Sequence, residues 1–104
     1  MDVVPLYPAV LNHPAEAQHI ARLAKKWFGP EHVSTEDLPL AASEDFSYFL
    51  EEKPGCFFAV GTLKPGETPK TLHTSDYNFN DDVLASGAYL WVRLVEDRLN
   101  VNLI

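Results

Sequence analysis

Apolar residues recur at helical spacing early in the chain, behind the sequence Asn12-His13-Pro14. His13 or Asn12 can cap a helix there, and Pro14 suits its first turn. Gly29-Pro30 is a typical helix stop, and Lys25 and Lys26 precede it, where the helix dipole favours cations. The spacing therefore predicts an amphipathic helix over residues 14–28. Its apolar face consists of Ala17, Ile20, Ala21, Ala24, Trp27 and Phe28.

The same spacing returns near the end of the chain and predicts a helix that begins after Asn80. Asn80 is a good cap, and Asp81 and Asp82 favour the positive end of the helix dipole. Gly87 lies inside this helix at a cost of about 1 kcal/mol relative to Ala, which a close contact with a sheet would explain. The tail, residues 100–104, is expected to form a short strand or a frayed end. The apolar stripe consists of Leu84, Ala88, Trp91, Val95 and Leu99, broadened by Val83, Leu90 and Leu94.

A shorter helix is expected at about residues 43–53, with Ser43 as its cap and Glu44 and Asp45 at its positive end. Pro54-Gly55 terminates it. Its apolar face is formed by Phe46, Phe49 and Leu50.

Strand signals lie around these helices. Residues 56–62 are apolar without alternation, which is typical of a strand covered on both faces. Residues 32–35 are a weak strand candidate, and residues 1–12 suit an edge strand or a connector because Pro5 and Pro8 cannot donate to a ladder. Residues 63–71 read as a loop. The element order predicts an α/β fold, with about three helices layered on a small sheet, in a single domain over residues 1–104.

Composition narrows the range of partners. The 104 residues carry a net charge of −7 with no basic cluster, which disfavours nucleic acid and anionic membranes as partners. No apolar run is long enough to span a bilayer, and the N-terminus lacks the features of a signal peptide. One cysteine, Cys56, excludes an internal disulfide and fits a reducing compartment, so a cytoplasmic location is expected.

The chemistry-bearing residues are few. The chain has no glycine-rich phosphate loop, paired-cysteine metal motif or serine-nucleophile motif. His73 stands out because it follows a long loop and precedes an acidic helix start, whereas Glu44 begins another helix. The imidazole could be a metal ligand, a general base or a surface residue, and helix capping alone explains the nearby acids. The other histidines, for which structural roles are favoured, are His13, His19 and His32.

Three ordered segments resemble one enzyme family. Residues 42–51, ASEDFSYFLE, are similar to its "GSEDFSYFLE" stretch, and residues 54–61, PGCFFAVG, to the "PGAFFFLG" strand that follows. Residues 72–82, LHTSDYNFNDD, resemble its site-closing "LHSPxYDFND" segment. Residues 7–12, YPAVLN, resemble the "YPAVxN" exit from its lid domain. The family is the group of metal-dependent amidohydrolases and aminoacylases that includes hippurate hydrolase, indole-acetyl-amino-acid hydrolase and N-acyl-amino-acid deacetylase, related to di-zinc carboxypeptidases.

The resemblance implies specific roles. His73 matches the family's final metal ligand, on the second ion of a two-metal site that holds Zn, or Mn, Co or Ni. Glu44 matches an acidic position near that site. In the family, the metals activate a water that attacks the amide of an N-acyl amino acid or peptide, with an upstream Glu as general base. The implied fold is the C-terminal portion of a zinc-peptidase-like catalytic domain, with residues 1–12 as the remnant of the lid exit.

The departures from the family's pattern lead to a fragment hypothesis. The other metal ligands, the general base and the lid arginine lie upstream in the family, and Ala42 stands where the family has Gly. The chain alone is therefore expected to be inactive and to bind metal weakly, and no complete catalytic set is assigned to it. A non-catalytic remnant acting as an interaction module is the alternative, and an unrelated α/β protein with chance motifs is a third. An exposed apolar face left by the missing part would favour self-association.

Overall fold

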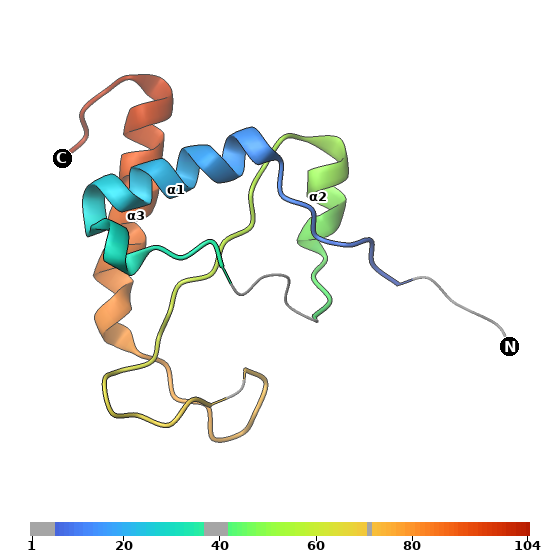
Figure 1. Ribbon diagram of the computed structural model, residues 1–104, viewed down its shortest axis with the longest axis vertical. Coiled ribbons are helices and arrows are strands. Elements are labelled where there is room, and N and C mark those ends of the chain that lie inside the picture. Colours follow the sequence, from blue (N-terminus) through green and yellow to red (C-terminus); the bar gives the residue numbers. More distant parts are fainter. Residues whose placement is uncertain (1–5, 37–41, 71) are drawn as a thin grey trace, which may run out of the picture. The chain divides into compact units, whose positions relative to one another are not determined.

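The computed structural model describes residues 6–36, 42–70 and 72–104. The chain divides into two compact units, Met1–Phe58 and Ala59–Ile104, and each is described by itself. The first unit contains the helix α1, the 3₁₀ helix η1 and the helix α2, and the second contains the 3₁₀ helix η2 and the helix α3 (Figure 1). Their bounds are α1 Pro14–Phe28, η1 Pro30–His32, α2 Phe46–Glu52, η2 Asp81–Val83 and α3 Leu84–Leu99.

Helix α1 confirms the predicted bounds. His13 is the N-cap residue and Pro14 occupies the first turn. Gly29 ends the helix with a φ of 93°, a conformation that favours glycine, and its N–H donates to the carbonyl of Lys25 at 3.1 Å. Leu23 of this helix is fully buried.

Helix α2 begins later than predicted. Its N-cap is Asp45, and Ser43 lies before the helix. The N–H of Ser47 donates to the carbonyl of Glu44, three residues back, so the first turn is tightened. Leu50 and Ser47 are the buried residues of this helix. The chain after α2 returns to the N-terminal end of α1 (Figure 1), where the N–H of His13 donates to the carbonyl of Gly55 at 3.0 Å.

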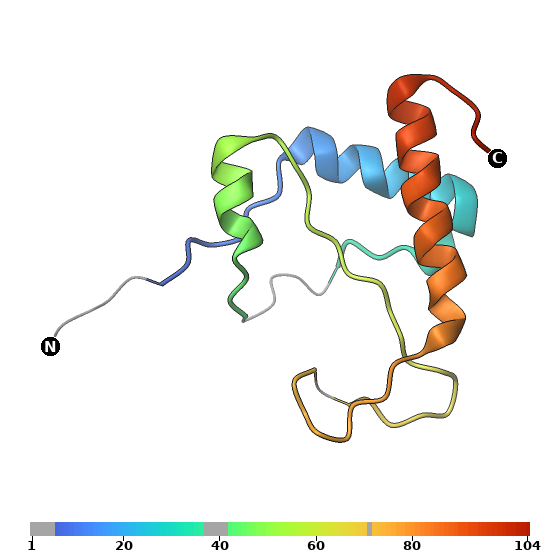
Figure 2. The same ribbon diagram turned by 180° about the vertical axis from the view of Figure 1, so that it is seen from behind.

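Helical structure begins after Asn80, as the sequence predicts, but residues 81–83 form the 3₁₀ helix η2 and α3 itself begins at Leu84. The side-chain oxygen of Asn80 accepts from the N–H of Asp82 at 3.0 Å, so Asn80 caps η2, which continues into α3. Asn100 ends the helix in the left-handed conformation, with φ 54° and ψ 47°. The tail then turns back on the helix, as Figure 2 shows, and the N–H groups of Leu103 and Ile104 donate to the carboxylate of Glu96. The tail is therefore neither a strand nor a frayed end.

The predicted layered sheet is wrong: the described residues contain helices and irregular segments and no strand. A strand needs a neighbour for its backbone groups, and the segment at residues 56–62 has no neighbouring strand within the described ranges. The side chain of Asn12 takes that place at one residue, since its oxygen accepts from the N–H of Phe57 at 2.7 Å and its amide donates to the carbonyl of Phe57 at 2.8 Å. The α/β assignment is thus replaced by an all-helical description.

The other strand candidates fail as well. Residues 30–32 form η1 and residues 33–36 have no regular structure, so the candidate at 32–35 is wrong. Residues 6–12 are a connector, and residues 1–5 of the same segment lie outside the described residues. The explanation offered for Gly87 is also wrong, because a Cβ added there would meet nothing within 4 Å.

Few apolar side chains form a core. Among the described residues, the buried apolar ones are Leu23, Leu50 and Leu90, of which Leu23 is fully buried. None of the helices in the described ranges is both long enough and apolar enough to cross a membrane.

Candidate functional site

His73 lies on the exposed loop that precedes η2. Its φ is 67°, in the left-handed region that few residues other than glycine adopt, although His is among those enriched there. Such a conformation persists where the surrounding chain enforces it, and it is frequent at functional sites. The backbone at His73 is therefore in an uncommon conformation that histidine adopts more readily than most residues.

Hydrogen bonds close the base of this loop. The amide of Asn80 donates to the carbonyl of Thr62 at 3.0 Å, and the hydroxyls of Thr62 and Tyr77 lie 3.3 Å apart. The ring of Phe79 meets that of Tyr77 edge-on, with centroids 4.9 Å apart. Residues 62 and 80 are thus held together, and His73 lies between them in the sequence.

Ion pairs join the two arms of the loop. The Nζ of Lys70 lies 3.4 Å from the carboxylate of Asp76 and donates to its backbone carbonyl at 2.9 Å. The Nζ of Lys64 lies 2.8 Å from the carboxylate of Asp82. Hydrogen bonds from the side chain of Thr74 and then from Lys70 lower the pKa of Asp76. These acids, which the sequence places near His73, are therefore engaged with other partners in the loop.

Glu44, the second candidate residue, serves the start of α2. Its Oε1 accepts from the N–H of Phe46 at 3.2 Å, and its side chain is half-buried. Asp45 is the N-cap residue but makes no side-chain cap hydrogen bond. Glu44 belongs to the first unit and His73 to the second, so the structure describes each in its own surroundings.

The other histidines have structural surroundings, as the sequence favoured. The Nδ1 of His13 accepts from the N–H of Gly55 at 3.2 Å, which binds the start of α1 to the turn after α2. The Nδ1 of His19 lies 3.2 Å from the guanidinium of Arg22, and His32 lies beside Glu31 at 3.5 Å. None of the three approaches a carboxylate pair in the described part of the chain.

Cys56 is poorly suited to nucleophilic chemistry. Burial, and secondarily the carboxylate of Glu16, raises the pKa of its thiol. A raised pKa lowers the fraction of thiolate, which is the reactive form.

Sequence reasoning missed the residues that shape the first unit. The side chain of Asn12 holds Phe57, and the hydroxyl of Tyr48 donates to the carbonyl of Leu6 at 2.6 Å. The rings of Tyr7 and Tyr48 also meet edge-on at 5.9 Å. The sequence had suggested Asn12 only as a possible helix cap. Tyr7, Asn12 and Tyr48 lie in motifs quoted for the family resemblance, which gave them no role.

The described residues do not by themselves form a metal centre. No group of three or more His, Cys, Asp or Glu side chains that could hold a metal ion occurs among them. A catalytic zinc usually takes three protein ligands. His73 could therefore supply one ligand, and further ligands would have to come from elsewhere.

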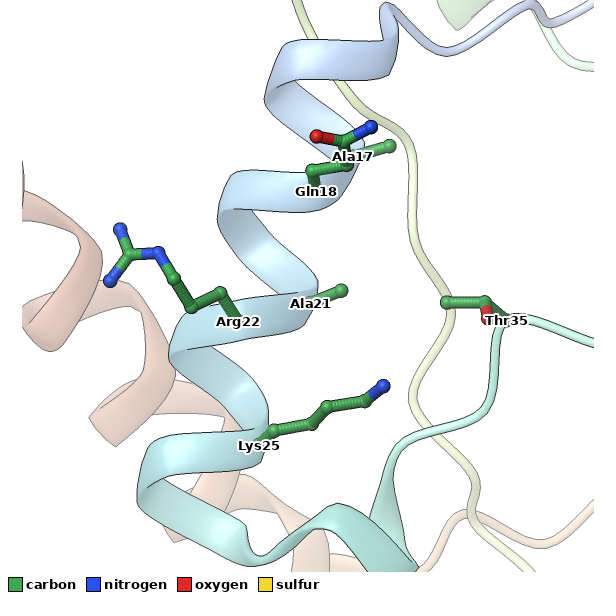
Figure 3. Close-up of a pocket in the computed structure, with 6 residues that line it drawn as sticks. All are labelled: Ala17, Gln18, Ala21, Arg22, Lys25 and Thr35. Atoms are coloured by element: carbon green, nitrogen blue, oxygen red, sulfur yellow. The ribbon is translucent and has the colours of Figure 1, made fainter.

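A shallow pocket of ≈ 610 Å³ lies on α1, away from both candidate residues in the sequence. Figure 3 shows Ala17, Ala21 and Lys25 facing Thr35, whereas Arg22 points to the other side of the helix. The lining contains no carboxylate and no imidazole, so this pocket offers no acid–base pair. Gln18 completes the lining.

Comparisons with known proteins agree on one family. The profile of "Peptidase family M20/M25/M40" matches residues 1–97. Hippurate hydrolase of Campylobacter jejuni is 34% identical over 87 residues, which are 84% of this chain and 22% of that protein. IAA-amino acid hydrolase ILR1-like 2 of Arabidopsis thaliana is 34% identical over 81 residues, 78% of this chain and 18% of its own length.

Thermostable carboxypeptidase 1 of Saccharolobus solfataricus is 32% identical over 86 residues, 80% of this chain and 20% of its own length. The chain thus spans about a fifth of the length of these relatives. No solved structure matches the chain significantly.

Proposed function

Because the chain belongs to peptidase family M20/M25/M40, we propose that it is the C-terminal part of a metal-dependent enzyme that hydrolyses the amide bond of N-acyl amino acids or related peptides. The observation that carries the proposal is the family match over residues 1–97, which includes the His73 loop. The chain's small share of its relatives' length supports the view that it is one part of a larger catalytic body.

The names of the relatives support the substrate class. They include a hippurate hydrolase, a hydrolase of IAA-amino acids and a carboxypeptidase. Substrates of these kinds have in common an amide whose nitrogen belongs to an amino acid with a free carboxylate. We therefore take such amides as the substrate class and the cytoplasm, which suits a chain with a single cysteine, as the location.

His73 is the residue of this chain that we assign to the metal site. His73 has a left-handed backbone and an exposed position, and its loop is closed by an ion pair and a hydrogen bond. These features suit a ligand whose placement is fixed before a metal binds. Zn, Mn, Co or Ni would accept an imidazole together with carboxylates. Such an ion, when bound, would polarise the amide or activate a water. Because one imidazole does not make a metal centre, the chain alone is proposed to be inactive.

A segment exchange tests the role of His73. The segment of C. jejuni hippurate hydrolase that this chain matches would be replaced by the chain, and hippurate hydrolysis would be measured with added Zn²⁺ or Mn²⁺. Loss of a residue that supports a ligand typically costs about 10–100-fold in metal affinity or activity, so His73→Ala should cost at least about 100-fold. His32→Ala, at an exposed histidine beside Glu31, is the matched control and should retain activity.

The proposal fails if the exchanged enzyme is active and His73→Ala leaves its rate unchanged. It also fails if the metal content measured by elemental analysis is the same in both His73 forms.

A further inference from the structure

Helix α3 exposes large apolar side chains and buries a charged one, which is the reverse of the usual pattern. The carboxylate residue Glu96 is only 6% exposed, whereas Leu84 and Leu99 are 67% and 66% exposed. Several large apolar side chains exposed to water along one helix indicate an interaction surface. The helix therefore presents to solvent the side that its sequence would bury.

The exposed apolar residues of α3 share one side of the helix with three partly buried ones, Gly87, Val92 and Leu94. At 3.6 residues per turn, positions 84, 87, 88, 91, 92, 94, 95 and 99 fall within an arc of about 160°. The only charge in that arc is Arg98, near its C-terminal end. Ser86, Arg93 and Glu96 lie outside it. We call this arc the outer face of α3, and its most exposed large residues are Leu84, Trp91, Val95 and Leu99.

The outer face also contains a point where the side chains are very small. Gly87 and Ala88 lie in it, and a Cβ at Gly87 would meet nothing within 4 Å. Gly inside a helix costs about 1 kcal/mol relative to Ala, and nothing in the described part of the chain uses the space that it leaves. A backbone or large side chain from outside the chain would fit closely at this point.

The width of the outer face distinguishes between two possible binding partners, a second copy of the helix and a globular body. A helix that pairs with another copy of itself in a coiled coil has a narrow apolar seam flanked by charged residues. Here the flanking positions hold Val92, Leu94 and Gly87, so the face is wide and its borders are apolar. A face this wide suits the core of a globular body. The comparisons supply such a body, since about four-fifths of each relative lies outside the matched segment.

We infer that the outer face of α3 is the docking surface for the part of the M20-type enzyme that this chain does not contain, an inference that rests on the proposed function. The partner surface is apolar, broad and uncharged, and it approaches most closely at Gly87. The chain would thus contribute to the enzyme through two separate features, the His73 loop and this face.

The test is co-purification. Tagged C. jejuni hippurate hydrolase lacking the segment that this chain matches would be co-expressed with the full chain, and the chain retained with it would be measured. The wild-type chain should be retained. Leu84→Glu should lower retention at least about tenfold, because a charge would be buried at the interface without a partner.

The controls distinguish loss of the docking surface from loss of helix structure and from loss of the metal ligand. Ser86→Glu places the same charge in the same first turn but outside the outer face, and it should be retained like the wild type. Circular dichroism should show equal helix content in both variants, since a carboxylate near a helix N-terminus is favourable. His73→Ala should also be retained, so that a failed metal assignment would leave this result intact. Leu99→Glu, at the other end of the face, should repeat the loss.

Absence of retention of the wild-type chain overturns the inference, as does retention of Leu84→Glu at the wild-type level. If the chain instead forms a dimer that Leu84→Glu converts to a monomer, and is never retained by the truncated enzyme, then the occupant is a second copy and the inference is wrong.

Discussion

The helices α1 and α3 have nearly the same length and were predicted from the same kind of apolar spacing, yet they differ in what covers them. Helix α1 buries Leu23 completely and keeps its other apolar residues at least half-covered at Ile20 and Trp27. Helix α3 leaves Leu84 and Leu99 exposed while it buries Glu96. Periodicity thus identifies the apolar face of a helix, but it does not say whether the surface that covers that face belongs to the same chain.

The two helices should differ most in how much stability is lost when a leucine is replaced by alanine. Leu23→Ala should lower the free energy of unfolding of the isolated chain by about 2–5 kcal/mol, because it removes a buried side chain and leaves a cavity. Leu84→Ala should change it by less than about 0.5 kcal/mol, because Leu84 is exposed and Ala is a good helix former. Urea titrations followed by circular dichroism measure both. If both variants lost the same free energy of unfolding, the outer face of α3 would already be covered within this chain.

A smaller effect is expected at the connection that replaces a strand in the first unit. Asn12→Ala removes two hydrogen bonds to the backbone of Phe57 and should cost about 1 kcal/mol, since the site is exposed and water can replace part of them. Asn102→Ala, at an exposed position in the tail, is the matched control. A neutral result at Asn12 would mean that the turn after α2 is held by other contacts, such as the hydrogen bonds between His13 and Gly55.

The smallest effect concerns the tail of the second unit. The N–H groups of Leu103 and Ile104, followed by Arg93, lower the pKa of Glu96 below its ordinary value. A carboxyl whose folded pKa is depressed stabilises the fold above its unfolded pKa and loses that contribution as pH falls through the folded pKa. The protection of the amides of residues 103 and 104 against exchange, taken relative to their intrinsic exchange rates, should therefore fall in acid below the usual Glu range.

The variant Glu96→Gln should remove this pH dependence of exchange, whereas Glu51→Gln, at an exposed glutamate of α2, should keep it. An unchanged profile in Glu96→Gln would show that the tail is held by other contacts.

Local signals predicted the helices well. The proline at the start of α1, the glycine at its end and the asparagine before η2 act within a few residues, so their effects can be read from the sequence. The late start of α2 shows the limit, because Ser43 looked like a cap but the tightened turn begins at Glu44. The sheet could not be judged locally, since residues 56–62 form a strand only if another strand lies beside them. That information is absent from the apolar pattern.

The site was predicted in a different way. His73 drew attention from its loop position, but only the family resemblance raised it above a surface histidine. Its left-handed backbone and the ion pair between Lys70 and Asp76 had no sequence signal, because both arise from how the loop closes. Glu44 was explained by helix capping from the start, and its hydrogen bond to Phe46 fits that explanation. Its relation to the metal site stays a prediction.

The most direct measurement is the initial rate of hippurate hydrolysis with added Zn²⁺, compared between the isolated chain and the same chain bound to hippurate hydrolase that lacks the matching segment. We expect no turnover by the isolated chain and turnover by the complex that His73→Ala abolishes. Turnover by the isolated chain that disappears in His73→Ala would contradict it, because the chain would then contain a complete site.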